Sequence, residues 1–144
     1  MKPPTFSSCK IISILFQLIP TIILLMERDS FVKSALSISY SAQDYNNLNI
    51  QFIVAISLFF FFTFGESLSH LVGCSILMPY QCIFSSLCHL FGGLFTFIFL
   101  LDRWPSSDYW YIFGFSSILP FVTECLTIAR MLAIKPHYRK RKTA

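Results

Sequence analysis

The chain has 144 residues, of which 55% are hydrophobic and only 12% are charged, with a formal net charge of +4. Because soluble domains usually contain about 25% charged residues, this composition excludes a water-soluble globular protein. Four apolar segments fill most of the chain and leave no room for a separate soluble domain. The sequence therefore predicts an all-α integral membrane protein, folded as a single four-helix bundle.

The first apolar segment covers about residues 8–26 and is interrupted by Gln17 and Pro20. A basic start followed by a short apolar stretch is also typical of a signal peptide. The residues that follow, 26–29, offer no small-residue cleavage site. We therefore predict a retained first span, which is short for a bilayer.

Residues 27–49 form the longest connection between apolar segments. Apolar residues alternate with serines over residues 36–41, a period-two pattern that predicts a short extended segment. Ser41 and Asp44 have the spacing of a capping box. This spacing predicts that the second helix begins near Ala42, outside the membrane.

The second span covers about residues 50–72 and the third about residues 80–101. Each carries small residues at helical spacing, which allow another helix to approach closely. We expect these two faces to bind partners or to close the bundle itself. The residues are Gly65, Ser69 and Gly73 in the second span and Ser85 and Gly92 in the third.

A tight turn at residues 102–108 precedes the fourth span, at about residues 109–133. Trp104 and the aromatic residues 109–111 are typical of an aromatic belt at the membrane interface. Pro120 lies in the middle of this span and predicts a kink in its helix.

Basic residues gather at the ends of the spans that adjoin the two termini. By the positive-inside rule, this bias places both termini in the cytosol, as an even number of spans permits. These residues are Lys2, Lys10, Arg130, Lys135, Arg139, Lys140, Arg141 and Lys142. The tail, residues 134–144, is expected to contact anionic lipid at roughly 1 kcal/mol per basic residue. The tail residues concerned are Lys135, Arg139, Lys140, Arg141 and Lys142.

Each predicted span carries one strongly polar side chain, and a rise of about 1.5 Å per residue places all four at a similar depth. They are Gln17, Glu66, His89 and Glu124. Since such groups need partners inside a membrane, we expect them to meet in one polar layer. The layer is structural, fixing the order of the helices, or a relay for protons or cations, or a site that recognises lipid or a partner helix. The chain lacks the repeats and paired broken helices typical of transporters, which favours the structural interpretation.

No local metal-ligand spacing, nucleophile elbow or phosphate-binding loop occurs in the sequence. We therefore predict no enzymatic activity, cofactor or metal site. The basic tail lacks interleaved aromatic residues, so we expect no nucleic-acid partner. An odd number of cysteines, 5, argues against a disulfide framework. Near the predicted inner face, Cys9, Cys74 and Cys82 are either buried inert thiols or sites of palmitoylation.

Several stretches of the chain resemble the transmembrane protein 107 family, and the resemblance extends over most of its length. The most specific stretch is YWYIFGFSSILPFVTE at residues 109–124. The others are the acid-Arg-Trp turn at residues 102–104, MERDSF at 26–31, the acidic Tyr-containing entrance at 44–45, Glu66 and His89. The resemblance implies the same four-span layout.

The same resemblance implies a non-enzymatic membrane scaffold of the ciliary transition zone. Members of this family belong to the Meckel-syndrome module, help recruit its other membrane proteins, and support the gate that controls ciliary membrane composition, ciliogenesis and signalling. The expected partners are the lipid bilayer and other transition-zone membrane proteins, and the oligomeric state is left open. The alternatives are a small proton- or cation-coupled transporter, or an ER membrane assembly factor with a dilysine retrieval signal at Lys140 and Lys142.

Overall fold

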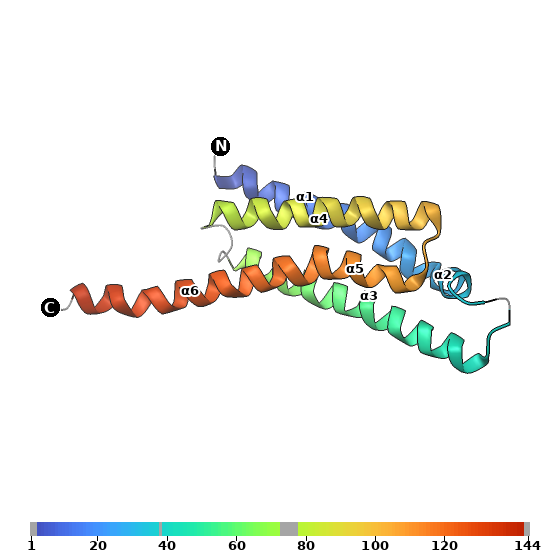
Figure 1. Cartoon of the computed structure of the whole chain (residues 1–144). Coiled ribbons are helices and arrows are strands. Elements are labelled where there is room, and N and C mark those ends of the chain that lie inside the picture. Colours follow the sequence, from blue (N-terminus) through green and yellow to red (C-terminus); the bar gives the residue numbers. More distant parts are fainter. Residues whose placement is uncertain (1–2, 38, 73–77, 143–144) are drawn as a thin grey trace.

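A computed structural model describes residues 3–37, 39–72 and 78–142 of the chain. The described residues form helices joined by short connections and contain no strand. Four helical segments are long and apolar enough to cross a membrane. Both termini lie at one end of the bundle, which we call the terminal end, and α2 lies at the other (Figure 1). The predicted all-α four-helix membrane fold is confirmed, and the cytosolic location of the termini stays a prediction.

The first layer of the bundle is a pair of helices, α1 (Pro3–Met26) and α4 (Pro79–Asp102). These two helices contact each other more extensively than any other pair. A Cβ atom added at Gly93 would lie 2.6 Å from Phe16 Cδ1 and 3.1 Å from the Gln17 Cα atom. The missing side chain at Gly93 therefore allows the two helices to pack closely.

The second layer contains α3 (Ala42–Leu71) and a long rod of three consecutive helical segments (Figure 1). The rod consists of α5 (Tyr109–Phe113), η2 (Gly114–Ile118) and α6 (Leu119–Lys142). It continues beyond the predicted span at 109–133, because α6 is helical to Lys142.

The segment η2 is a π-helical turn that ends two residues before Pro120. Proline has no N–H for the carbonyl four residues earlier and its ring crowds that carbonyl. A π turn widens the helix at this point and relieves both problems. The irregularity expected at Pro120 thus takes the form of a π turn, within which Ser116 and Ser117 are fully buried.

The connection between the first two spans contains a short helix, α2 (Arg28–Ser34). The sequence analysis did not predict this helix. Its Phe31 and Val32 are 2% and 0% exposed, so α2 covers the end of the bundle core. The extended segment predicted at residues 36–41 is not continuous. The described residues of that stretch form no strand, and the chain bends at Leu36 and Ser39, whereas Ser41 has extended backbone dihedral angles.

The capping box at the start of α3 is confirmed. The Ser41 hydroxyl accepts from the Asp44 backbone N–H at 3.2 Å, and the Asp44 carboxylate accepts from the Ser41 backbone N–H at 3.2 Å. Because this box satisfies backbone donors at the helix start, α3 begins at Ala42, well before the predicted span at about residue 50.

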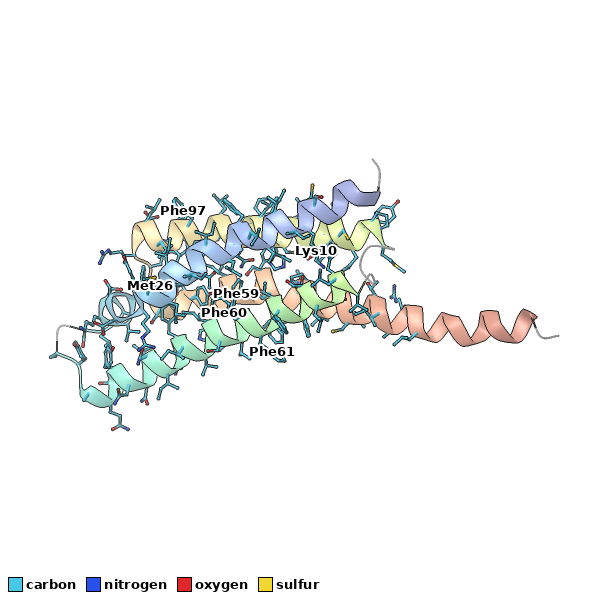
Figure 2. All side chains as sticks on the ribbon, turned by 180° about the vertical axis from the view of Figure 1, so that it is seen from behind. Lys10, Met26, Phe59, Phe60, Phe61 and Phe97 are labelled. Atoms are coloured by element: carbon cyan, nitrogen blue, oxygen red, sulfur yellow. The ribbon has the colours of Figure 1, made fainter. Side chains whose placement is uncertain are left out.

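The half of the bundle next to α2 is filled by a buried apolar cluster, which we call the aromatic core. Phe31 stacks on Phe99 with ring centroids 5.3 Å apart. Figure 2 shows Phe59 between the two layers, whereas Phe61 and Phe97 lie on outer faces. The core consists of Leu24, Phe31, Val32, Phe52, Ala55, Ile56, Phe59, Phe99, Tyr109, Ile112 and Phe113.

Tyr109 belongs to this core and not to an interfacial belt, as its sequence position had suggested. It is 1% exposed and meets Phe52 edge to face at 5.5 Å, whereas Tyr111 is 81% exposed. The turn before it begins at Arg103, which adopts a left-handed conformation with φ 50° and donates to Ser30 Oγ at 2.9 Å. This hydrogen bond therefore connects the turn to α2.

A polar contact on the exposed surface joins α2 to α3. Asp29 accepts hydrogen bonds from Lys33 Nζ at 2.6 Å and from Tyr45 Oη at 2.5 Å. The hydrogen bond from Lys33, followed by that from Tyr45, lowers the pKa of Asp29 below its ordinary value of 3.8.

This contact predicts how the α2 end responds to acid. A lowered folded-state pKa means that the stabilisation is present above pH 3.8 and is lost as the pH falls through the folded-state pKa. Hydrogen exchange of the α2 amides, corrected for intrinsic rates, should be constant from neutral pH to about pH 5 and rise below about pH 4. Asp29→Asn should show the faster exchange at neutral pH, and Asp102→Asn, at an exposed position, should not. Equal exchange in the wild type and in Asp29→Asn at neutral pH would contradict this assignment.

Candidate functional site

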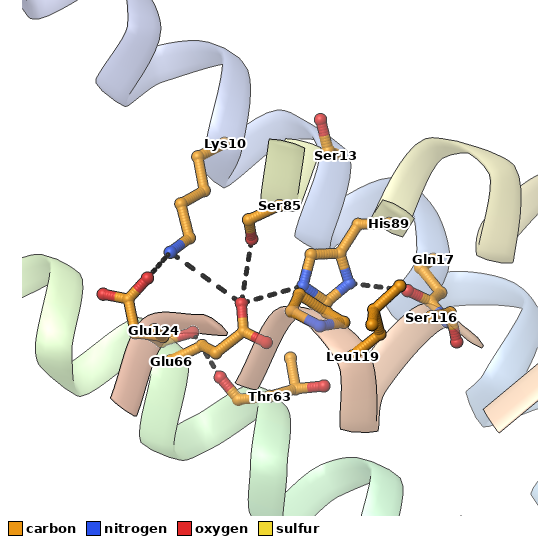
Figure 3. A network of polar contacts seen from close by, with 12 residues as sticks. Lys10, Ser13, Gln17, Thr63, Glu66, Ser85, His89, Ser116, Leu119 and Glu124 are labelled. Carbon is orange, nitrogen blue, oxygen red and sulfur yellow. Dashed lines mark hydrogen bonds and ion pairs between the residues drawn. The ribbon is translucent and has the colours of Figure 1, made fainter. Parts of the chain in front are cut away.

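The terminal half of the bundle contains a set of connected polar side chains, which we call the polar network (Figure 3). All four membrane-spanning segments contribute to it, and its two carboxyl groups, its lysine and its histidine are at most 2% exposed. Its members are Lys10, Gln17, Glu66, Ser69, Gln81, Ser85, His89, Ser116 and Glu124.

Glu66 of α3 lies at the centre of the polar network. Its Oε2 atom accepts a hydrogen bond from Ser85 Oγ at 2.9 Å and lies 3.1 Å from His89 Nε2. Lys10 Nζ is 3.8 Å from the same oxygen. A carboxylate is costly inside a membrane unless it has partners, and here α1 and α4 supply them.

His89 of α4 connects Glu66 to the deeper part of the network. Its Nδ1 atom lies 2.6 Å from Gln17 Oε1, and Gln17 Nε2 donates to Ser116 Oγ at 2.6 Å. Because the Gln17 amide presents its oxygen to the ring, Nδ1 of His89 is the donor in this contact. The imidazole therefore links α1 to α3, and Gln17 extends the link to the π turn.

Lys10 is the member of the network whose position the sequence analysis misjudged. It was grouped with the basic residues that flank the spans, but it is 0% exposed. Its Nζ atom is 3.1 Å from Glu124 Oε2, so it bridges the two glutamates. The sequence contained one signal: Lys10 precedes Gln17 by two helical turns, which places both on one face of α1.

Glu124 of α6 receives further hydrogen bonds from two other helices. Ser69 Oγ of α3 donates to Glu124 Oε1 at 2.7 Å. Gln81 Nε2 of α4 donates to Thr123 Oγ1 at 2.9 Å and lies 3.4 Å from Glu124 Oε2. Gln81 and Ser116 were not predicted as site residues, because a single amide or hydroxyl has no distinctive sequence pattern.

The network places groups of opposite charge next to each other. Lys10 and Glu124 form an ion pair. His89 Nε2 and Glu66 Oε2 are 3.1 Å apart. Close pairing is what surroundings of low dielectric constant require of buried charges.

The four predicted polar residues are connected but do not lie in one thin layer. Gln17, His89 and Glu66 are linked by direct contacts, and Glu124 joins them through Lys10. From Lys10 to Gln17 the network extends along α1 for about 10 Å. It runs from the terminal end of the bundle toward the aromatic core.

Gly65 and Gly92, two of the predicted small-residue positions, lie against other helices of the bundle. A Cβ atom added at Gly92 would lie 2.2 Å from Ser116 Cβ and 2.7 Å from Gln17 Nε2. One added at Gly65 would lie 3.0 Å from Phe121 Cε2. Both glycines thus provide room for side chains of the same chain.

The predicted serine positions also serve the bundle itself. Ser69 donates to Glu124 and Ser85 donates to Glu66. Gly73, the last residue of the predicted row, lies outside the described residues. The described members of the two faces therefore close the bundle, which was one of the two expectations.

Of the three cysteines considered for palmitoylation, Cys9 is exposed and Cys82 is 2% exposed, so Cys82 is not accessible for acylation. Cys74 lies outside the described residues. The tail residues Lys135, Arg139, Lys140, Arg141 and Lys142 lie on the last turns of α6. Their contact with anionic lipid stays a prediction. Among the described residues, no three His, Cys, Asp or Glu side chains are grouped as a metal site requires.

Comparison with known proteins identifies a family. The family model described as "TMEM107: Transmembrane protein" matches residues 6–128, a range that includes the whole polar network. Human transmembrane protein 107 is 29% identical over 126 residues, which are 88% of this chain and 90% of the human protein. The Xenopus laevis protein of that name is 28% identical over 109 residues, 76% of this chain and 78% of its own length. No solved structure matches the chain.

The buried ion pair predicts a large effect of removing its cation. Lys10→Met leaves two carboxyl groups without an ammonium partner and should lower the free energy of unfolding by about 3–5 kcal/mol. Thermal unfolding in detergent or steric trapping in bilayers would measure it. Lys33→Met, which removes an exposed ion pair, is the matched control and should change stability by less than about 1 kcal/mol. Adding Glu124→Leu to Lys10→Met should recover part of the loss, and equal effects of the two lysine variants would refute the role of Lys10.

The close approach at Gly92 predicts a second effect. Gly92→Ala forces a methyl group against Ser116 and Gln17, and should cost about 1–3 kcal/mol of unfolding free energy. Gly114→Ala is the control, because nothing lies within 4 Å of its added Cβ atom. That variant should be neutral or stabilising by up to about 1 kcal/mol. The same unfolding assay measures both variants. A Gly92→Ala variant as stable as the wild type would show that the helices can separate at this position without penalty.

Proposed function

The chain belongs to the transmembrane protein 107 family, and we propose that it is a non-enzymatic membrane scaffold of the ciliary transition zone. In this role it helps recruit or assemble other transition-zone membrane proteins of the Meckel-syndrome module. It thereby maintains the ciliary gate that ciliogenesis and signalling require.

The single observation that supports a scaffold is that the charged groups in the membrane-spanning part bind one another. Lys10, Glu66, His89 and Glu124 are buried and joined by ion pairs and hydrogen bonds. Such contacts determine which helix faces which, although a hydrogen bond between membrane helices adds only about 0.6 kcal/mol on average. The bundle thus holds its outer helix faces in fixed positions, which is what recruitment of other membrane proteins needs.

The course of the network argues against the alternative of a proton- or cation-coupled transporter. The network ends at Gln17 and Ser116, next to the aromatic core. Farther along the bundle, Thr21 and Thr96 donate to carbonyls of their own helices at 3.0 Å and 2.7 Å, and Thr21 also hydrogen-bonds to Tyr109 of the core. A transport pathway needs polar groups or water across the whole membrane. In this bundle the aromatic core would interrupt such a pathway.

The proposal predicts where the protein resides and what its residence requires. A tagged chain expressed in ciliated cells should concentrate at the ciliary base. Lys10→Met should lose this concentration because the bundle no longer holds its outer faces in place, whereas Lys33→Met should keep it. Quantitative fluorescence imaging against a transition-zone marker measures both.

Three outcomes would contradict the proposal. The first is an even distribution of the wild type over the ER or plasma membrane. The second is redistribution out of the ER on substituting Lys140 and Lys142 by serine, which would favour the ER assembly factor. The third is proton flux into liposomes containing the wild type that is lost in Glu124→Gln, which would favour the transporter.

A further inference from the structure

A groove of about 420 Å³ opens beside the turn that joins α4 to α5. This turn lies at the end of the bundle farthest from the two termini (Figure 1). The α4 wall of the groove contains Phe95, the turn contributes Trp104 and Asp108, and the opposite wall contains Tyr111 and Phe115. The volume falls within the range of about 300–1,000 Å³ found for small-molecule sites.

The mouth of the groove carries one negative charge, that of Asp108. The Asp108 side chain makes no capping hydrogen bond to α5 and accepts one from Ser107 Oγ at 3.3 Å. Among the described residues, Asp108 forms no ion pair. The described residues that line the groove include no Lys, Arg or His. A cationic group on a ligand would therefore complement the charge of this mouth.

The surroundings of the mouth do not offset this charge. The two connections at this end of the bundle, residues 27–49 and 102–108, contain five acidic and three basic residues. Two of the basic side chains are engaged elsewhere, since Lys33 pairs with Asp29 and Arg103 donates to Ser30 Oγ. An excess of negative charge raises the local concentration of cations.

The aromatic side chains at the mouth favour one kind of cation. Trp104 packs edge to face on Phe99 with ring centroids 6.3 Å apart, so the aromatic core holds it in place. Tyr111 is 81% exposed and is accessible to a ligand. Tryptophan and tyrosine rings beside a carboxylate are suited to a quaternary ammonium group, which cation–π attraction holds. A primary ammonium is more strongly hydrated and loses more on entering such a site.

The deeper part of the groove is apolar. Phe115 lies about 10 Å from Asp108 along the rod, and Phe95 lies about 10 Å from the end of α4 at Asp102. Both rings are partly exposed, at 45% and 43%. The ligand that fits is therefore an amphiphile with a cationic head and an apolar chain. An anionic phospholipid would place its charge near Asp108, and a sterol has no cation to pair with it.

We propose that this groove binds phosphatidylcholine. The trimethylammonium group lies between the Asp108 carboxylate and the rings of Trp104 and Tyr111, and one acyl chain runs along Phe95 and Phe115. This site goes beyond the scaffold function and is independent of it, because it rests on the groove, its charge and its aromatic rings alone.

The test uses the purified full-length chain in detergent micelles with a phosphatidylcholine that carries a photoreactive group in its acyl chain. Labelled peptides, mapped by mass spectrometry, should come from α4, α5 and η2. Unlabelled phosphatidylcholine should displace the label at about tenfold lower concentration than phosphatidylethanolamine with the same acyl chains. Asp108→Asn should weaken phosphatidylcholine binding about tenfold, and Tyr111→Leu about threefold.

Asp102→Asn is the matched control, since it removes an exposed carboxylate at the same end of the bundle, outside the groove. It should leave the labelling unchanged, and thermal unfolding should show that all three variants remain folded. Labelling spread over all the spans, or equal labelling of wild type and Asp108→Asn, would overturn the site. Equal displacement by phosphatidylethanolamine would overturn recognition of the quaternary ammonium. A photoreactive residue at position 115 that captures a second copy of the chain in place of lipid would overturn the proposed occupant.

Discussion

The cost of burying charge is the constraint on which this bundle depends. Glu66 and Glu124 come from α3 and α6, and Lys10 of α1 reaches both of them. Breaking such a set by removing one partner is far more destabilising than the set itself is stabilising. The ion pairs therefore act mainly by excluding other arrangements of the four helices, since any helix order that separates these groups leaves a charge alone in hydrocarbon.

The two halves of the bundle are held by different forces. Next to α2, aromatic rings fill the space between the layers, and shape decides how they pack. Toward the terminal end, hydrogen bonds and ion pairs join the same helices. The π turn before Pro120 lies between the aromatic core and the polar network. It carries Ser116, which is the hydrogen-bond partner of Gln17. Packing on one side and polar pairing on the other together fix the positions of the outer helix faces.

This arrangement assigns separate tasks to the inside and the outside of the protein. The small residues Gly92 and Ser85 are buried and serve contacts within the chain. The outer faces of the helices carry the exposed apolar side chains. An apolar groove between α1 and α3 belongs to these outer faces, and it exists because α1 packs mainly on α4.

The sequence by itself determined the membrane class, the four apolar segments, the capping box at Ser41 and the polar residues Gln17, Glu66, His89 and Glu124. These are local properties, since hydropathy, helix period and cap spacing can be read within one segment. Only the tertiary structure decided that Lys10 is buried, that Tyr109 belongs to the core and that Gln81 and Ser116 join the network. Each of these depends on which helix lies opposite: a lysine at a span end normally reaches the interface, and here carboxylates from two distant segments hold it inside.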